Sequence, residues 1–200
     1  EAKASRKRER GSEPPLEFSQ FPWLLDGDGE FGDRTWTLMV WSGGKASALG
    51  PNDCWAEIDF TWAPDSQSLF VSHDPRTEPF MEPNDAVLER IELTGKASRL
   101  ASRPGGKSML SVSPSGRYLA LVLDPLEDFQ WGIRRQRILV HDLKSGEISE
   151  PLADRDLLIS GHPLSDCRDM SSPAILWNDE ETFGLPWSEK GVYGFAEVNW

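Results

Sequence analysis

The chain has 200 residues, of which 38% are hydrophobic and 27% are charged, a composition typical of a folded globular protein rather than of a disordered segment. Its net charge is −12, and outside the first ten residues it is −15 (16 basic and 31 acidic side chains), so we expect neither nucleic acid nor a membrane surface as a partner. No apolar run is long enough to cross a bilayer, and the basic first ten residues lack the apolar core of a signal peptide. We therefore expect a cytoplasmic protein, and we interpret the basic start as a solvated edge or linker in preference to a nucleic-acid-binding or localisation tract.

The two cysteines, Cys54 and Cys167, lie far apart in the sequence and fit no metal-binding spacing or redox motif. We expect free thiols in a reducing compartment, with a single disulfide as the alternative.

Organised chain is predicted to begin at Leu16, because residues 1–15 are charged and end in two prolines. Residues 35–41 favour a strand throughout. The segment 42–44, with its two glycines, then reverses the chain into residues 45–49. This composition predicts a β-hairpin.

The hairpin recurs along the chain at a fixed interval. Gly44, Gly95 and Gly146 each begin a similar short segment, and successive glycines are 51 residues apart. A fixed interval of this length is the mark of a repeat architecture. Each glycine follows a predicted strand, at residues 38–41, 88–93 and 138–143.

A second element alternates with the hairpins. Pro114 and Gly116 form a predicted turn before six consecutive apolar residues, Tyr118–Leu123, which suit a strand buried on both faces. Similar strand, turn and strand patterns occupy residues 62–72 and 174–185. Each unit therefore contains four strands in about fifty residues.

Four short antiparallel strands per repeat predict an all-β fold, a β-propeller fragment of four-stranded antiparallel blades, two whole and two partial. Residues 84–93 also have helical spacing, but their place before a hairpin favours a strand. We expect a charged N-terminal segment at 1–15 and a partial propeller at 16–200, with blades at approximately 16–50, 51–104, 105–155 and 156–200. Long insertions are expected at 75–83, 125–135 and 154–172.

Ser42 is the most tempting nucleophile, since a serine followed by glycines after a strand resembles the Gly-x-Ser-x-Gly nucleophile elbow. Val40 replaces the first glycine of that motif, and a hairpin strand follows in place of a helix. We therefore interpret this segment as a structural turn.

No other residue pattern supports a catalytic, cofactor-binding or metal site. The histidines lack zinc-site spacing, a calcium-like acidic loop has Thr37 where its last carboxylate is required, and the paired carboxylates are ordinary in so acidic a chain. Tryptophans on or beside predicted strands are interpreted as packing between blades. These candidates are His73, His141, His162, Asp26–Glu30, Asp124, Asp128, Asp154, Asp156, Trp36, Trp41, Trp62 and Trp177.

The order of the less regular segments resembles a known family. Residues 25–33 followed by 36–41 are similar to the segment that leads into a blade in serine peptidases of the prolyl oligopeptidase family, especially the acylaminoacyl-peptidase-like group. Residues 63–65, the loop containing 131–132, and residues 152–156 follow in that group's order. The blade pattern itself is shared with TolB-type and WD-like propeller repeats.

The chain departs from the family pattern at several turns. Asp65-Ser66 and Asp179-Glu180 replace the usual Asp-Gly, and Asn178 stands where a proline is expected. In addition, family members carry their catalytic Ser, Asp and His in an α/β-hydrolase domain after the propeller, and no segment here matches that domain. No catalytic residue is therefore assigned.

The resemblance implies a non-catalytic propeller that admits only short peptides to a C-terminal hydrolase domain, absent from these residues, where serine acylation with a histidine base occurs. The partners would be that domain and short peptide substrates, with a homo-oligomer also open and no cofactor. The alternative is a non-enzymatic TolB-like or WD-like propeller that serves as a protein-interaction scaffold. The chain starts at Glu1 and ends at Trp200 within a strand-like segment, so we expect both ends to be cuts and strand edges to be exposed.

Overall fold

The computed structural model forms two compact units by internal contacts, Glu1–Arg34 and Thr35–Trp200. In the first unit, β1 (Leu24–Leu25) pairs antiparallel with β2 (Gly29–Glu30). The described part has no helix long and apolar enough to cross a membrane. Besides the backbone of β1 and β2, the structure describes residues 35–56, 58–77, 82–127, 135–156, 158–159, 174–190 and 192–200.

The second unit begins with a hairpin of β3 (Met39–Ser42) and β4 (Lys45–Ala48). Gly43 and Gly44 make the turn with φ angles of 58° and 80°, a left-handed conformation that glycine adopts without a steric penalty. Leu38, just before β3, is buried against the strands that follow.

The first whole sheet contains β5 (Asp59–Trp62), β6 (Ser68–His73), β7 (Val87–Glu92) and β8 (Ala97–Arg99). Each strand pairs antiparallel with the next in chain order. Every residue of β6 is buried. The strand at β7 confirms that 84–93 does not form the helical turn considered from its spacing.

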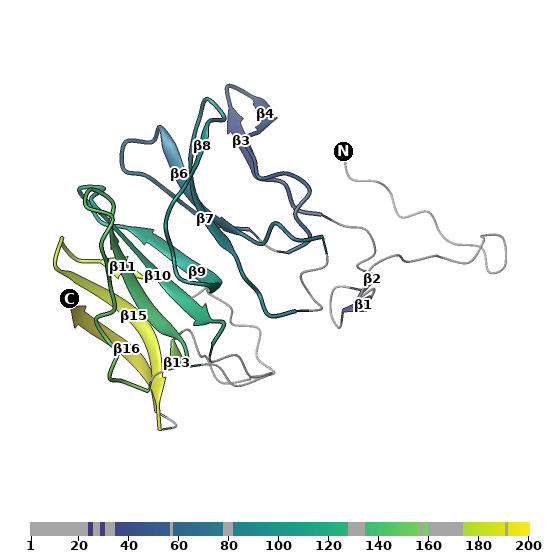
Figure 1. Cartoon of the computed structure of the whole chain (residues 1–200). Coiled ribbons are helices and arrows are strands. Elements are labelled where there is room, and N and C mark those ends of the chain that lie inside the picture. Colours follow the sequence, from purple (N-terminus) through teal and green to yellow (C-terminus); the bar gives the residue numbers. More distant parts are fainter. Residues whose placement is uncertain are drawn as a thin grey trace. The chain divides into compact units, whose positions relative to one another are not determined.

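The second whole sheet contains β9 (Gly105–Val112), β10 (Tyr118–Pro125), β11 (Arg137–Asp142) and β12 (Ile148–Ser149), again paired in chain order. Figure 1 shows β9, β10 and β11 side by side in this sheet. The pairing of β9 with β10 shifts between Ala120 and Val122, a β-bulge.

The third sheet contains β13 (Leu158–Ile159), β14 (Leu176–Trp177), β15 (Thr182–Glu189) and β16 (Val192–Asn199). β16 pairs with the whole length of β15, while β13 and β14 pair with opposite ends of it. A strand has only two edges, so β13 and β14 share one of them as two pieces of an interrupted first strand. The insertion predicted at 154–172 falls largely between these pieces, and its residues 160–172 lie outside the described part.

The sheets pack face to face in chain order. We call the side of a sheet that faces earlier residues its preceding face and the opposite side its following face. Directly paired residues of antiparallel strands share a face, which assigns each side chain. The following face of the first sheet, with Phe70 and Leu88, packs against Leu119, Leu121 and Leu139 of the second.

The second interface repeats this arrangement. Ala120, Val122 and Ile138 on the following face of the second sheet pack against Phe183 and Leu185 on the preceding face of the third. All five side chains are at most 1% exposed. Full burial of an aliphatic or aromatic side chain contributes about 1.5–3 kcal/mol, so these interfaces carry most of the stabilisation. The described part is therefore all-β, with two whole propeller-type blades and two partial ones, as predicted.

The turns of neighbouring blades also contact each other. Glu180, in the turn before β15, accepts hydrogen bonds from Ser113 Oγ (2.9 Å), Ser115 Oγ (2.7 Å) and Ser115 N (2.6 Å) in the turn before β10. Although burial acts to raise the pKa of Glu180, these bonds lower it overall. Glu180, which stands where this turn usually has glycine, thus supplies a carboxylate that joins two blades.

Replacing Glu180 with alanine is expected to reduce the free energy of unfolding by about 1–3 kcal/mol, because the buried Ser113 hydroxyl loses its acceptor. Chemical denaturation of the wild type and Glu180→Ala measures this difference. Glu181→Ala, at the adjacent exposed position, is the matched control. Equal losses for both variants would contradict a specific joint between the turns.

Candidate functional site

Ser42 lies at the end of β3 and pairs with Lys45 across the Gly43–Gly44 turn. It is exposed, and strand β4 follows it in place of the helix that a nucleophile elbow requires.

The described residues contain one constellation with the order nucleophile, base and acid. Cys54 Sγ lies 3.7 Å from His73 Nδ1, and His73 Nε2 lies 3.2 Å from Glu89 Oε2. Cys54 and His73 are not neighbours in the sequence, and the fold brings them into contact. Cys54 precedes His73 by 19 residues and Glu89 follows it by 16, so only the tertiary fold shows the contact.

The first sheet and the segment before it position these three side chains. His73 ends β6, and Glu89 on β7 is its diagonal neighbour on the preceding face, since Val71 pairs with Glu89. Cys54 is held by backbone hydrogen bonds in both directions with Trp36, at 2.7 and 2.9 Å.

The electrostatics of the cluster oppose nucleophilic chemistry. Burial raises the pKa of the Cys54 thiol, and the nearby carboxylates of Asp53, Asp74 and Glu89 raise it further. A reactive cysteine requires a lowered pKa and access to substrate, whereas Cys54 is only 6% exposed. In this resting form the cluster is a hydrogen-bonded chain that fastens the Cys54 segment to the first sheet.

A second polar cluster closes the loop between β6 and β7. The buried carboxylate of Asp74 pairs with Arg76, whose Nη2 also donates to Pro83 O (2.8 Å). Although burial acts to raise the pKa of Asp74, the hydrogen bonds from Arg76 lower it overall. Asp85 then accepts a bond from Gly105 N (2.9 Å), which ties the loop to β9. These bonds connect the two ends of the insertion predicted at 75–83.

Two basic groups lie buried near the interface of the first and second sheets. Lys107 Nζ donates to Ala86 O (2.6 Å) and Gly105 O (2.8 Å), and burial lowers its pKa to about 8. His141 is 4% exposed, and its Nε2 has no hydrogen-bond partner among the described residues. Burial, then the charges of Lys107 and Arg103, lowers the pKa of His141 to about 4. In the described part, no group of three or more His, Cys, Asp or Glu residues is arranged to hold a metal ion.

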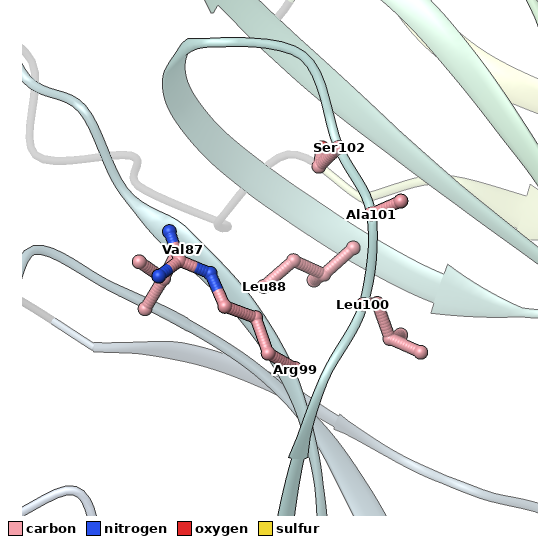
Figure 2. A pocket seen from close by; sticks show the side chains of 6 residues that line it. All are labelled: Val87, Leu88, Arg99, Leu100, Ala101 and Ser102. Atoms are coloured by element: carbon pink, nitrogen blue, oxygen red, sulfur yellow. The ribbon is translucent and has the colours of Figure 1, made fainter.

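A cavity of 390 Å³ opens beside β7 and β8 (Figure 2). Its volume is in the range of small-ligand sites, but its lining has no histidine, cysteine or carboxylate. Ser102 Oγ is buried there without a hydrogen-bond partner among the described residues. The lining residues are Val87, Leu88, Arg99, Leu100, Ala101 and Ser102.

The carboxylates considered from the sequence lie in different segments of the chain. Asp124 lies in β10, and Asp154 and Asp156 are exposed in the segment after β12. Thr37, at the end of the calcium-like loop, accepts a hydrogen bond from Asp53 N (3.3 Å). His162, Asp128 and the side chains of the loop at 26–30 lie outside the described residues.

The tryptophans divide into two groups. Trp177 packs between the second and third sheets as predicted, with Nε1 donating to Ser111 O at 3.2 Å. Trp36, Trp41 and Trp62 are instead 46%, 72% and 44% exposed, so the prediction of packing between blades is wrong for them in the described part.

No protein-family model and no curated protein matches the chain. Among solved structures, the tricorn protease matches with a TM-score of 0.46 and 15% identity, over 76% of this chain and 14% of that chain. TolB from Acinetobacter baumannii matches with a TM-score of 0.45 and 14% identity, over 80% of this chain and 36% of that chain. This chain therefore spans well under half the length of either structure, and its propeller-type description rests on its own sheet order and packing.

The thiol of Cys54 is expected to react with a disulfide reagent far more slowly in the native protein than in urea, because it is buried and protonated. The reaction is followed by absorbance after the protein is mixed with the reagent, in a Cys167→Ser variant whose one remaining thiol is Cys54. Rapid native reaction at neutral pH would show instead that His73 activates Cys54.

Stability is expected to fall as the pH is lowered from about 6.5 to about 4. Burial lowers the pKa of His141 to about 4 in the folded chain, so over this pH range mainly the unfolded chain binds a proton at His141, and proton binding stabilises the unfolded state. The lowered pKa of His141 corresponds to a decrease of roughly 3 kcal/mol in the free energy of unfolding between these pH values. Urea unfolding of the wild type and His141→Leu across this pH range isolates it. The two curves should diverge on acidification, and parallel curves would contradict the prediction.

Proposed function

We propose that the chain is the non-catalytic propeller portion of a cytoplasmic serine peptidase, where it restricts the hydrolase active site to short peptides. The hydrolase domain lies outside these 200 residues. The observation that carries the proposal is the stacking of successive antiparallel blades through apolar faces, since this architecture builds a ring around a channel.

The first strands of the blades support a channel-lining role. β9 contacts both β5 and β14, so the three first strands lie next to one another. At the contact between β5 and β9, Asp59 accepts a hydrogen bond from Leu110 N (3.4 Å) beside the bulge. A narrow channel lined by such strands excludes folded proteins and admits extended peptides. The order of loops that resembles the acylaminoacyl-peptidase-like group adds the peptidase role.

One observation favours the alternative function of a non-enzymatic interaction scaffold. Leu176, Tyr193 and Phe195 lie on one face of the third sheet by register and are 51–61% exposed, and clustered exposed apolar side chains mark protein-binding surfaces. A scaffold would use these surfaces directly and would need no hydrolase domain.

The two functions separate when the natural polypeptide that carries this chain is treated with a fluorophosphonate probe and assayed with peptides of increasing length. We expect the probe to label a serine outside residues 1–200 and cleavage to be confined to short peptides. Glu180→Ala should extend cleavage to longer peptides by loosening the joint between two blades, whereas Glu181→Ala should not. Absence of a labelled serine would overturn the peptidase function and leave the scaffold.

A further inference from the structure

A cavity of 390 Å³ lies at one end of the first sheet. Val87 begins β7 and Arg99 ends β8, and residues 100–104 then lead from this sheet to β9. Figure 2 shows the Arg99 side chain extending alongside Val87, with Ser102 on the opposite side of the space. The cavity is therefore bounded by two strand ends and by the linker between two blades.

Apolar packing surrounds β7 on both faces. Ile91 of β7 belongs to the apolar cluster that contains Leu38, and Leu88 belongs to the cluster that contains Leu121 of the second sheet. The elements on either side of β7 are thus described, and the cavity remains beside the strand. Packing of the first sheet with its neighbours does not fill this space.

Arg99 supplies a positive charge to the cavity. It is the one arginine among the described residues whose side chain has neither an ion pair nor a hydrogen bond. Glu89 is its direct partner across β7 and β8, but the Glu89 carboxylate lies 3.2 Å from His73 Nε2. A guanidinium has five N–H donors in a planar arrangement that matches a carboxylate. Those donors are available to a ligand in the cavity.

Ser102 supplies a buried hydroxyl group. Its Oγ has no hydrogen-bond partner in the part of the chain that the structure describes. The buried serines Ser68, Ser72 and Ser113, by contrast, each have a side-chain hydrogen bond of 2.9–3.0 Å. Burial of a hydroxyl without a partner is unfavourable, so such a group in a native structure indicates a missing hydrogen-bonding partner. A ligand in the cavity that Ser102 lines supplies that partner.

The surroundings of Arg99 are basic, although the chain as a whole has a net charge of −12. Burial lowers the pKa of Lys107 to about 8, Asp85 acts to raise it, and the charge of Arg99 acts to lower it further. Lys107 therefore lies within electrostatic range of Arg99, and it is mostly protonated at neutral pH. Two neighbouring positive charges favour an anion in the cavity. The remaining lining is apolar and consists of Val87, Leu88, Leu100 and Ala101.

We infer that this cavity binds a small aliphatic carboxylate that carries a hydrogen-bonding group at its far end. The carboxylate pairs with Arg99, the aliphatic chain lies along Leu88 and Leu100, and the far group hydrogen-bonds to Ser102 Oγ. Small-molecule sites combine an apolar wall with a few polar groups that fix the orientation of the ligand, and this lining has that composition. The inference rests on the cavity and not on the proposed function.

A carboxylate fits this lining better than a phosphate. One guanidinium forms two parallel hydrogen bonds with one carboxylate. Phosphate sites gather more donors, such as successive backbone N–H groups or a helix N-terminus, whereas this cavity is lined by strand ends and a linker without a glycine. The acidic chain also disfavours ligands with several negative charges.

Saturation-transfer difference NMR with the natural polypeptide that carries this chain tests the carboxylate. Hexanoate should bind with a dissociation constant in about the millimolar range, as expected for a ligand of this size. Hexanamide, which has the same chain without the charge, should bind about tenfold or more weakly. Arg99→Met should weaken the binding of hexanoate by about the same factor.

Lys96→Met is the matched control for Arg99→Met. The Lys96 side chain is 75% exposed, carries the same charge in the same hairpin and does not line the cavity. Circular dichroism verifies that each variant is folded, and Arg99→Gln replaces Arg99→Met if the latter is not.

A series of ω-hydroxy carboxylates tests Ser102. Among ω-hydroxyhexanoate and its shorter and longer homologues, at least one should bind about threefold or more tightly than the plain carboxylate of the same length. Ser102→Ala should abolish this gain and leave the binding of hexanoate unchanged. It should also be at least as stable in urea as the wild type, because the hydroxyl has no hydrogen bond among the described residues to lose.

Four outcomes would overturn the inference. Absence of saturation transfer to hexanoate would exclude the ligand class, and equal binding of hexanoate and hexanamide would exclude an anion site. Equal losses for Arg99→Met and Lys96→Met would reduce the contact to general attraction by positive charge. A series in which no ω-hydroxy carboxylate depends on Ser102 would exclude a ligand that spans the cavity.

Discussion

The structure depends on one strand that is buried on both faces. β10 directs Leu119, Leu121 and Leu123 toward the first sheet and Ala120 and Val122 toward the third. A shift of one residue in its register would exchange these sets and force leucines into the space of an alanine and a valine. The order of large and small side chains along β10 therefore fixes both interfaces at once.

Directional bonds across the same interfaces determine how the sheets are placed on each other. Apolar packing has no preferred direction, but the bonds of Glu180 to the Ser113 turn and of Trp177 Nε1 to Ser111 O have fixed donors and acceptors. At the interface of the first and second sheets, Asp59 accepts a hydrogen bond from Leu110 N. Burial raises the pKa of Asp59, while backbone hydrogen bonds act in the opposite direction. Each interface thus combines an apolar centre with a polar contact near the first strand or its turn.

The repeat was predictable because its signals are local. Gly44, Gly95 and Gly146 occupy equivalent hairpin turns with φ angles of 80°, 86° and 80°, a conformation that short-range sequence chemistry specifies. The interrupted first strand of the third sheet was not predictable, since the two residues of β14 are too few to show a period. The exposure of Trp62 was also beyond sequence reasoning, because a strand tryptophan has the same pattern whether or not a neighbouring blade covers it.

The Cys54 cluster was missed for a related reason. Its three members come from three segments, and only the tertiary contact of the Cys54 segment with β6 unites them. A sequence search for nucleophiles is drawn instead to Ser42, whose glycines serve a hairpin. The glycines beside Ser42 thus form the turn that the sequence predicts, whereas no local motif signals the contact of Cys54 with His73.

The acids and bases of the described residues are arranged against nucleophilic chemistry. Carboxylates gather around Cys54 and hold its proton in place, while Lys107 and His141 lie buried near the next interface, where burial favours their neutral forms. A nucleophile and a base that work together need the opposite arrangement, with a depressed thiol pKa beside an accessible imidazole. The Cys54 cluster therefore acts as a structural contact between its segment and the first sheet, and His73 does not activate the thiol as a nucleophile.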